Sequence, residues 1–218
     1  GYPGNDELGN LTMVYGDSTR EKENGLGDKI RAFPRSFILA PQQQQTVRFQ
    51  VRPEQGLTSG TYFTRVKVTS NAQTADIDES AQSGVSTQIN FKFDQVIAVF
   101  QKVGEVKTGL EIGNISTLKN ENTLKVIHDF QTTGNSPFLG SVTAILKNGN
   151  NQIIAEQQQT VAMYYSGKKS IDFELPNGIA AGTYQVELSY ESKRADIPSQ
   201  DLIQVAPVKK TFSLQIAE

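Results

Sequence analysis

Apolar and polar positions alternate along much of this chain, and the alternation predicts β-strands in both halves. In residues 47–52 and 62–68 the two kinds of side chain take turns, which is the period of a half-buried strand. Runs of the same kind lie at residues 124–130, 142–146, 184–190 and 212–216. No stretch has a helical period longer than a turn or two. The sequence therefore predicts an all-β fold.

The region 86–101 is a longer β-prone run with a change of pattern inside it. Ile89, Phe91 and Phe93 alternate with polar residues, whereas Val96–Phe100 is continuously apolar. A strand with alternating positions buries one face, and a strand with a continuous apolar run buries both. We therefore expect this strand to pass from one-sided to two-sided burial near Asp94.

Two related corners divide the chain. Leu57–Tyr62 and Ile179–Tyr184 both end in Gly-Thr-Tyr just before an alternating run. A tyrosine near the start of the penultimate strand is typical of immunoglobulin-like sandwiches. The 218 residues suffice for two such domains of roughly 100 residues each. With the boundary at the change of composition after Lys102, we predict domains at 1–103 and 104–218.

The first predicted sandwich is short of strands. An immunoglobulin-like sandwich needs about seven strands, and residues 1–102 offer four or five. Upstream sequence could supply the others, or the polar segment 1–28 could supply poor strands, of which Leu11–Tyr15 is the clearest; a third source is another chain. An unfilled sandwich exposes sheet edges and apolar side chains, which favours strand addition from a partner.

Three short motifs in the first half carry a family resemblance. Pro34–Pro41 fits Pro-x-x-Phe-x-Leu-x-Pro, Gln45–Arg48 fits Gln-x-Val-Arg, and Leu57–Tyr62 fits Leu-x-x-Gly-x-Tyr. Over residues 30–102 the chain thus resembles the periplasmic pilus-assembly chaperones, the PapD-like family, although the glycine usual after the second proline is Gln42. The resemblance implies two immunoglobulin-like domains. It also implies that the last strand of the first domain lends apolar side chains to an unfinished pilin sandwich.

On this resemblance the donor positions fall on Ile89, Phe91 and Phe93. Three apolar side chains on one face of an edge strand can fill a partner's groove while the backbones pair. The alternative is that all three point into the core of their own domain.

The resemblance is incomplete at the family's basic clamp for a client's terminal carboxylate. No arginine is visible for the first strand, and Ala98 stands where the family has a lysine. Of the run Val99–Val103, only Phe100 and the basic character of Lys102 agree, so Lys102 is a possible basic contact. The second half also departs from the family.

Composition and single residues point away from other chemistries. The chain has no cysteine and a net charge of −2, without a visible basic stripe, which argues against nucleic acid as a partner. No apolar run approaches the roughly 20 residues of a membrane span. His128 is expected to be structural because no nucleophile or ligand motif accompanies it. Asp76–Glu79 is expected to be a solvated acidic loop, so no metal, cofactor or enzyme activity is predicted.

These features together predict a non-enzymatic protein of the periplasm or cell surface. It would bind an exported β-rich, pilin-like subunit by strand addition along residues 86–100. The alternative is a structural or adhesive module of a cell-envelope protein that uses the same fold passively.

Overall fold

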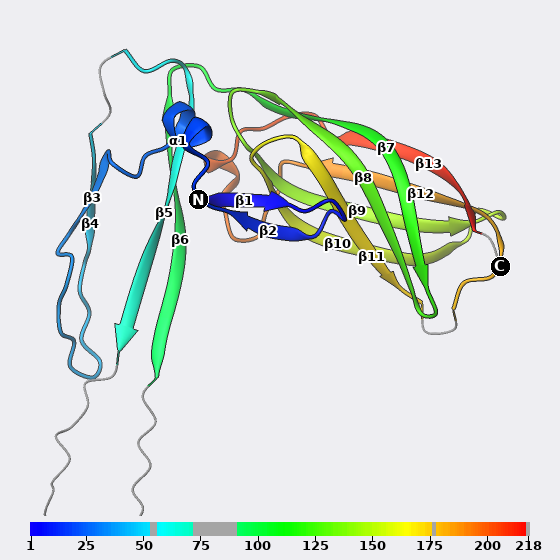
Figure 1. Ribbon diagram of the computed structural model, residues 1–218, viewed down its shortest axis with the longest axis horizontal. Coiled ribbons are helices and arrows are strands. Elements are labelled where there is room, and N and C mark those ends of the chain that lie inside the picture. The colour runs from blue at the N-terminus through cyan, green and yellow to red at the C-terminus, as the bar shows by residue number, and fades with distance from the viewer. Residues whose placement is uncertain (53–55, 72–90, 176–177, 217–218) are drawn as a thin grey trace, which may run out of the picture.

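A computed structural model describes residues 1–52, 56–71, 91–175 and 178–216, and these confirm the all-β prediction. Figure 1 shows long antiparallel strands joined by turns, with helical structure limited to α1 (Ser18–Asn24) and the 3₁₀ turn η1 (Ser199–Asp201) among the described elements. No described sheet takes strands from both sides of Val103. The division into two domains at this point stays a prediction.

The second half consists of two antiparallel sheets with a shared core, as in a β-sandwich. One sheet has the order β10-β9-β12-β13 and the other the order β11-β8-β7. Their strands are β7 (Thr108–Asn120), β8 (Thr123–Gly134), β9 (Phe138–Asn148), β10 (Ile153–Met163), β11 (Gly167–Glu174), β12 (Gly182–Glu191) and β13 (Val208–Ile216). A short turn at 149–152 joins β9 to β10.

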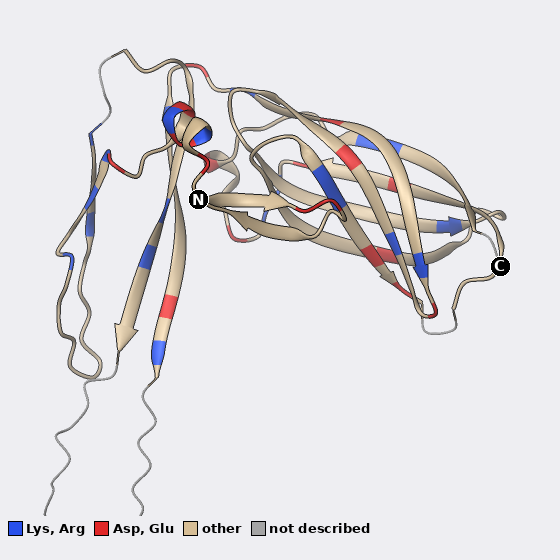
Figure 2. Cartoon of the chain, viewed as in Figure 1, with Lys and Arg blue, Asp and Glu red and all other residues tan. Residues whose placement is uncertain are grey.

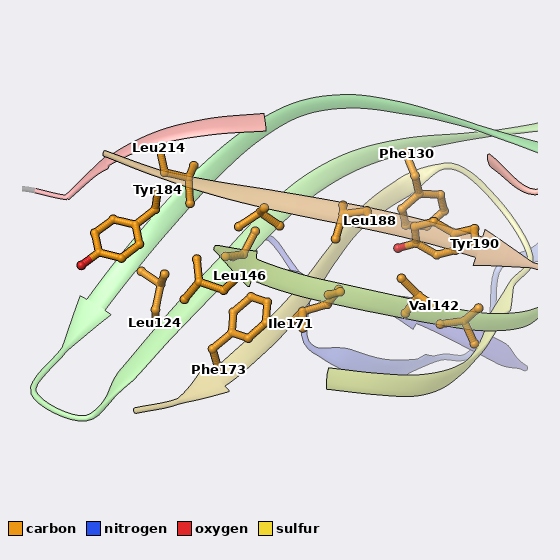
Figure 3. Packing of buried hydrophobic residues seen from close by; sticks show 14 of the residues in the cluster. Leu124, Phe130, Val142, Leu146, Ile171, Phe173, Tyr184, Leu188, Tyr190 and Leu214 are labelled. Atoms are coloured by element: carbon orange, nitrogen blue, oxygen red, sulfur yellow. The ribbon is translucent and has the colours of Figure 1, made fainter. Parts of the chain in front are cut away.

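The alternating positions of these strands form one core, as the pattern predicted. Every second side chain of β9 and of β12 is buried, because successive residues of a strand point to opposite faces. Figure 3 shows side chains from both sheets, such as Leu146, Phe173 and Leu188, pointing toward one another. The predicted corner tyrosine is also present, since the hydroxyl of Tyr184 donates a hydrogen bond to the carbonyl oxygen of Ala180 at 3.1 Å.

The first half has two separate two-stranded sheets instead of a filled sandwich. β3 (Ile30–Phe33) pairs with β4 (Arg48–Val51), and β5 (Gly60–Asn71) pairs with β6 (Lys92–Val103). Among the described residues neither sheet has a third strand. The corner tyrosine of the first half forms the same contact as that of the second half. The hydroxyl of Tyr62 donates to the carbonyl oxygen of Thr58 at 3.1 Å.

The N-terminal segment does not complete this half. β1 (Tyr2–Asn5) and β2 (Leu11–Val14) pair with each other and lie against the second half. The backbone N–H of Ser170 in β11 donates to the carbonyl oxygen of Gly9 at 3.0 Å, and Lys168 forms an ion pair with Glu7 at 2.7 Å. Residues 1–28 therefore give the first half no sheet strand, apart from a single bridge between Gly25 and Phe63.

The expected two-sided burial of β6 is wrong. The β5–β6 ladder runs without a register shift from Gly60 and Val103 to Asn71 and Lys92. Val96 and Ile97 are 44 % and 43 % exposed, although they point to opposite faces. Two-sided burial needs cover on both faces of the hairpin, and within the described part of the chain that cover is incomplete.

Candidate functional site

The predicted donor positions lie at the far end of β6 from the second half. Phe93 pairs with Ser70, and Phe91 directly precedes the strand. Each of the two rings is 74 % exposed. The alternative that these rings fill their own core is therefore contradicted for Phe91 and Phe93. Ile89 lies outside the described residues.

Phe93 belongs to an apolar face of the β5–β6 hairpin. Because alternate residues share a face, Phe93, Ile97 and Val99 lie on one side of β6. Directly paired residues also share a face, which adds Val66, opposite Ile97, and Val68 of β5. Val68 and Ile97 are both 43 % exposed, so the middle of this face is also in contact with solvent.

The outer edge of β6 offers its backbone to a partner. β6 pairs with β5 alone in the described part of the chain. The outward N–H and C=O groups of an edge strand are the groups on which another strand can be added. The opposite edge of the hairpin is blocked at one point, where the N–H of Leu26 donates to the carbonyl oxygen of Phe63 at 3.0 Å.

A cleft of about 770 Å³ opens at the other end of β6, where the hairpin meets the second half. Ala98 and Phe100 of β6 line one side, and Leu139 and Ala162 line the other. The predicted basic contact Lys102 also lines this cleft. Its ammonium group donates to the backbone carbonyl oxygen of Asp201 at 2.7 Å.

The cleft contains two arginines with different partners. The guanidinium of Arg194 donates to both carboxylate oxygens of Asp196, at 2.9 and 2.6 Å, so its charge is already matched. Arg65 lies directly opposite Ala98 in the β5–β6 ladder, and its guanidinium donates to the sulfur of Met13 at 2.9 Å. Among the described residues Arg65 has no carboxylate partner.

Sequence reasoning missed Arg65. Arg65 is the cross-strand neighbour of Ala98, the position where the resemblance led us to look for a cation, and only the pairing register of β5 with β6 reveals this. That register is not encoded in a short turn, because the connection between the strands is long. An alternating strand with an arginine among its apolar residues was the one available signal.

A cluster of aromatic rings forms the wall between the cleft and the N-terminal hairpin. The ring centroids of Phe63 and Tyr164 are 4.6 Å apart, and Phe100 stacks on Tyr164 at 6.0 Å. Tyr2 contacts Tyr165 at 4.8 Å. Burial raises the pKa of Tyr164 to about 12, so this hydroxyl stays neutral at physiological pH. The cluster joins both halves through apolar packing.

The described residues show no functional site at the other candidate from the sequence, His128. His128 is buried in the second half, and its Nε2 lies 2.6 Å from the hydroxyl of Tyr190. Burial, with a smaller contribution from nearby Lys169, lowers its pKa to about 4, which keeps the imidazole neutral. Asp76–Glu79 lies outside the described residues. The residues that are described contain no group of three or more side chains arranged to hold a metal ion.

The site has to be interpreted from its own geometry. No protein-family model matches this chain, and a search of curated proteins finds no match either. Within the described ranges, no helix has the length and apolar character needed to cross a bilayer.

Proposed function

We propose that this chain is an exported, non-enzymatic, chaperone-like protein that binds a β-rich, pilin-like subunit by strand addition along β6. The observation that carries the proposal is the pair of residues Phe91 and Phe93, each 74 % exposed beside a strand edge that no other described strand pairs with. Contiguous exposed apolar patches often mark interaction sites. Periplasm or cell surface is the compartment that this function requires.

The topology supports an immunoglobulin-like interpretation of both halves. A seven-stranded immunoglobulin sandwich has the strand orders ABED and CFG. With β7–β13 lettered A to G, the second half has the sheets A-B-E and D-C-F-G, so β10 pairs with β9 in place of β11. Each half has a corner tyrosine at the start of its penultimate strand. In the first half, the pairs β3–β4 and β5–β6 correspond to D–E and F–G.

The free energy of apolar burial also favours binding at the edge of β6. Burying one phenylalanine side chain contributes roughly 1.5–3 kcal/mol, so two rings in a partner's groove supply a substantial part of a micromolar affinity of about 8 kcal/mol. The main-chain hydrogen bonds of an added strand fix its register. Apolar pockets for alternate side chains then select the partner.

Arg65 supplies the anchor that the sequence did not reveal. A client strand that runs along β6 toward Val103 ends in the cleft, where Arg65 has no carboxylate partner among the described residues. A charge-assisted hydrogen bond from a guanidinium to a terminal carboxylate is typically worth about 1.5–3 kcal/mol. Arg65 therefore takes the role that the family gives to the lysine replaced by Ala98.

The test is binding of a synthetic peptide with alternating apolar residues and a free C-terminus, measured by fluorescence anisotropy. The double variant Phe91→Ser/Phe93→Ser is expected to weaken binding about 100-fold, because two buried rings are lost. Arg65→Gln is expected to weaken binding only of the peptide with a free carboxylate and to leave the amidated peptide unaffected.

The matched control is Ile153→Ser/Ile154→Ser, which removes two exposed apolar side chains, 59 % and 43 %, from the edge strand β10. This control should bind as the parent protein does. Equal affinities for all variants would refute strand addition at β6, provided that far-UV circular dichroism shows each variant folded.

A structural or adhesive module is the second candidate. It is favoured by the ion pair of Arg194 with Asp196 and the bond from Lys102 to Asp201, which leave only one cation of the described cleft unmatched. Failure of the parent protein to bind any extended peptide would favour this passive role.

A further inference from the structure

We infer that the basic face of the β3–β4 hairpin is a second docking surface, which binds an acidic protein through a cluster of arginines. This surface is separate from the edge of β6, and the inference does not depend on strand addition. It rests on the charge balance of residues 29–52 and on the pairing of β3 with β4.

The segment 29–52 has an unusual charge balance. It contains five basic residues and no acidic one, although the whole chain has 21 basic and 23 acidic residues. The five are Lys29, Arg31, Arg35, Arg48 and Arg52. Figure 2 shows blue on both strands of the β3–β4 hairpin, with red only in the turn that precedes β3. In sequence the basic residues lie in two groups, so the stripe is not visible before pairing.

Pairing brings the two groups to one face. Arg31 lies opposite Gln50, and Phe33 lies opposite Arg48, so these four side chains share a face. The ladder continues to Lys29, whose carbonyl oxygen accepts from the N–H of Arg52 at 2.8 Å. The other face is apolar, with Ile30 and Ala32 opposite Val51 and Phe49. The hairpin is therefore amphipathic, with one basic face.

None of these five cations has an ion pair or a side-chain hydrogen bond within the described part of the chain, and all except half-buried Lys29 are exposed. Elsewhere the basic side chains are often matched, as in Lys125 with Asp172 and Lys147 with Glu187. The cations that share this face repel one another, and a partner with carboxylates relieves that repulsion.

The residue types favour a protein as the partner. Four of the five cations are arginines, and Phe33 lies among them with 51 % of its surface exposed. Arginine and aromatic side chains are enriched at protein interfaces, whereas lysine is depleted there. The guanidinium fork also fits a carboxylate with two parallel hydrogen bonds. A polyphosphate offers the arginines phosphate but gives Phe33 no packing partner.

The experiment measures binding of fluorescent poly-L-glutamate that carries interspersed tyrosines, at 50 and 300 mM salt. The parent protein is expected to bind it, with an affinity that falls as salt rises. Arg31→Glu/Arg48→Glu should weaken binding about tenfold or more, and Arg31→Gln/Arg48→Gln should weaken it less. Circular dichroism checks the fold of each variant, and the glutamine pair keeps the test valid if the reversed pair does not fold.

The control is Lys209→Glu/Lys210→Glu, which makes the same change of net charge at two exposed lysines of β13. It should bind nearly as the parent protein does. An equal loss in this control would overturn the inference, because net charge alone would then explain binding. Tighter binding of polyphosphate or of phosphatidylglycerol vesicles than of the glutamate polymer at equal salt would overturn it as well.

Discussion

The strands of the two halves have the same alternation of apolar and polar residues, but the two halves differ in how far the apolar residues are buried. In the second half, residues such as Phe138, Leu146 and Phe173 have no exposed surface. In the first half, Leu26, Tyr62 and Phe63 are the buried large apolar residues among those described, and Phe63 packs on the aromatic rings of the second half. Alternation therefore specifies which face of a strand is apolar, but only neighbouring strands determine whether that face is buried.

The comparison also locates the function that we propose. A sandwich that fills its own core has no need of a partner strand, because its apolar area is already removed from water. Two hairpins with exposed apolar faces can still remove apolar area from water by binding a partner strand. The second half has a buried core of its own, and the first half carries both proposed binding surfaces.

The largest expected difference comes from one substitution made in each half. Phe173→Ala should lower the free energy of unfolding by about 3–5 kcal/mol, since it removes a fully buried ring and leaves a cavity. Phe93→Ala should leave it nearly unchanged, because that ring is 74 % exposed. Urea denaturation followed by circular dichroism measures both values. Similar losses for the two variants would remove the distinction between the halves.

A second difference concerns the free energy of unfolding at low pH. The pKa of His128 falls from 6.5 to about 4 in the folded chain, so between these values the unfolded state binds more protons. The free energy of unfolding of the second half should therefore decrease by about 3 kcal/mol as the pH drops from 6.5 to 4. Lys169 strengthens this effect and Asp129 opposes it. His128→Gln should flatten the pH dependence in this window, and an unchanged slope would contradict the assignment.

The smallest effect compares the two corner tyrosines. Tyr184→Phe removes one hydrogen bond, from the hydroxyl to Ala180, and should cost the second half about 1 kcal/mol. Tyr62→Phe removes the equivalent bond to Thr58 but should leave the main unfolding transition in place. Differential scanning calorimetry distinguishes the two. Equal shifts of one transition would show that the halves unfold together.

Much of the fold was predictable because it depends on local pattern. The period of two identified the inner faces of β9 and β12, and the Gly-Thr-Tyr corners identified the hydroxyl contacts of Tyr62 and Tyr184. These features depend on side chains a few residues apart. The exposure of Phe91 and Phe93 was one of two alternatives left open.

What was not predictable depends on distant partners. The position of Arg65 opposite Ala98 and the basic face of β3–β4 both require a pairing register that no short turn specifies. The docking of β1–β2 on β11 was missed for the same reason. The helix α1 had a local signal, since the Asp17 side chain accepts from the N–H of Arg20 as an N-cap, but seven residues give too short a period to detect.

The docking of the N-terminal hairpin has a consequence for the order in which the chain is made. Glu7 and its ion-pair partner Lys168 are separated by 161 residues. At a synthesis rate of about 5–20 residues per second, the hairpin emerges on the order of ten seconds before its docking strand exists. The β1–β2 hairpin therefore cannot reach its final place until β11 has been made, well after the hairpin itself.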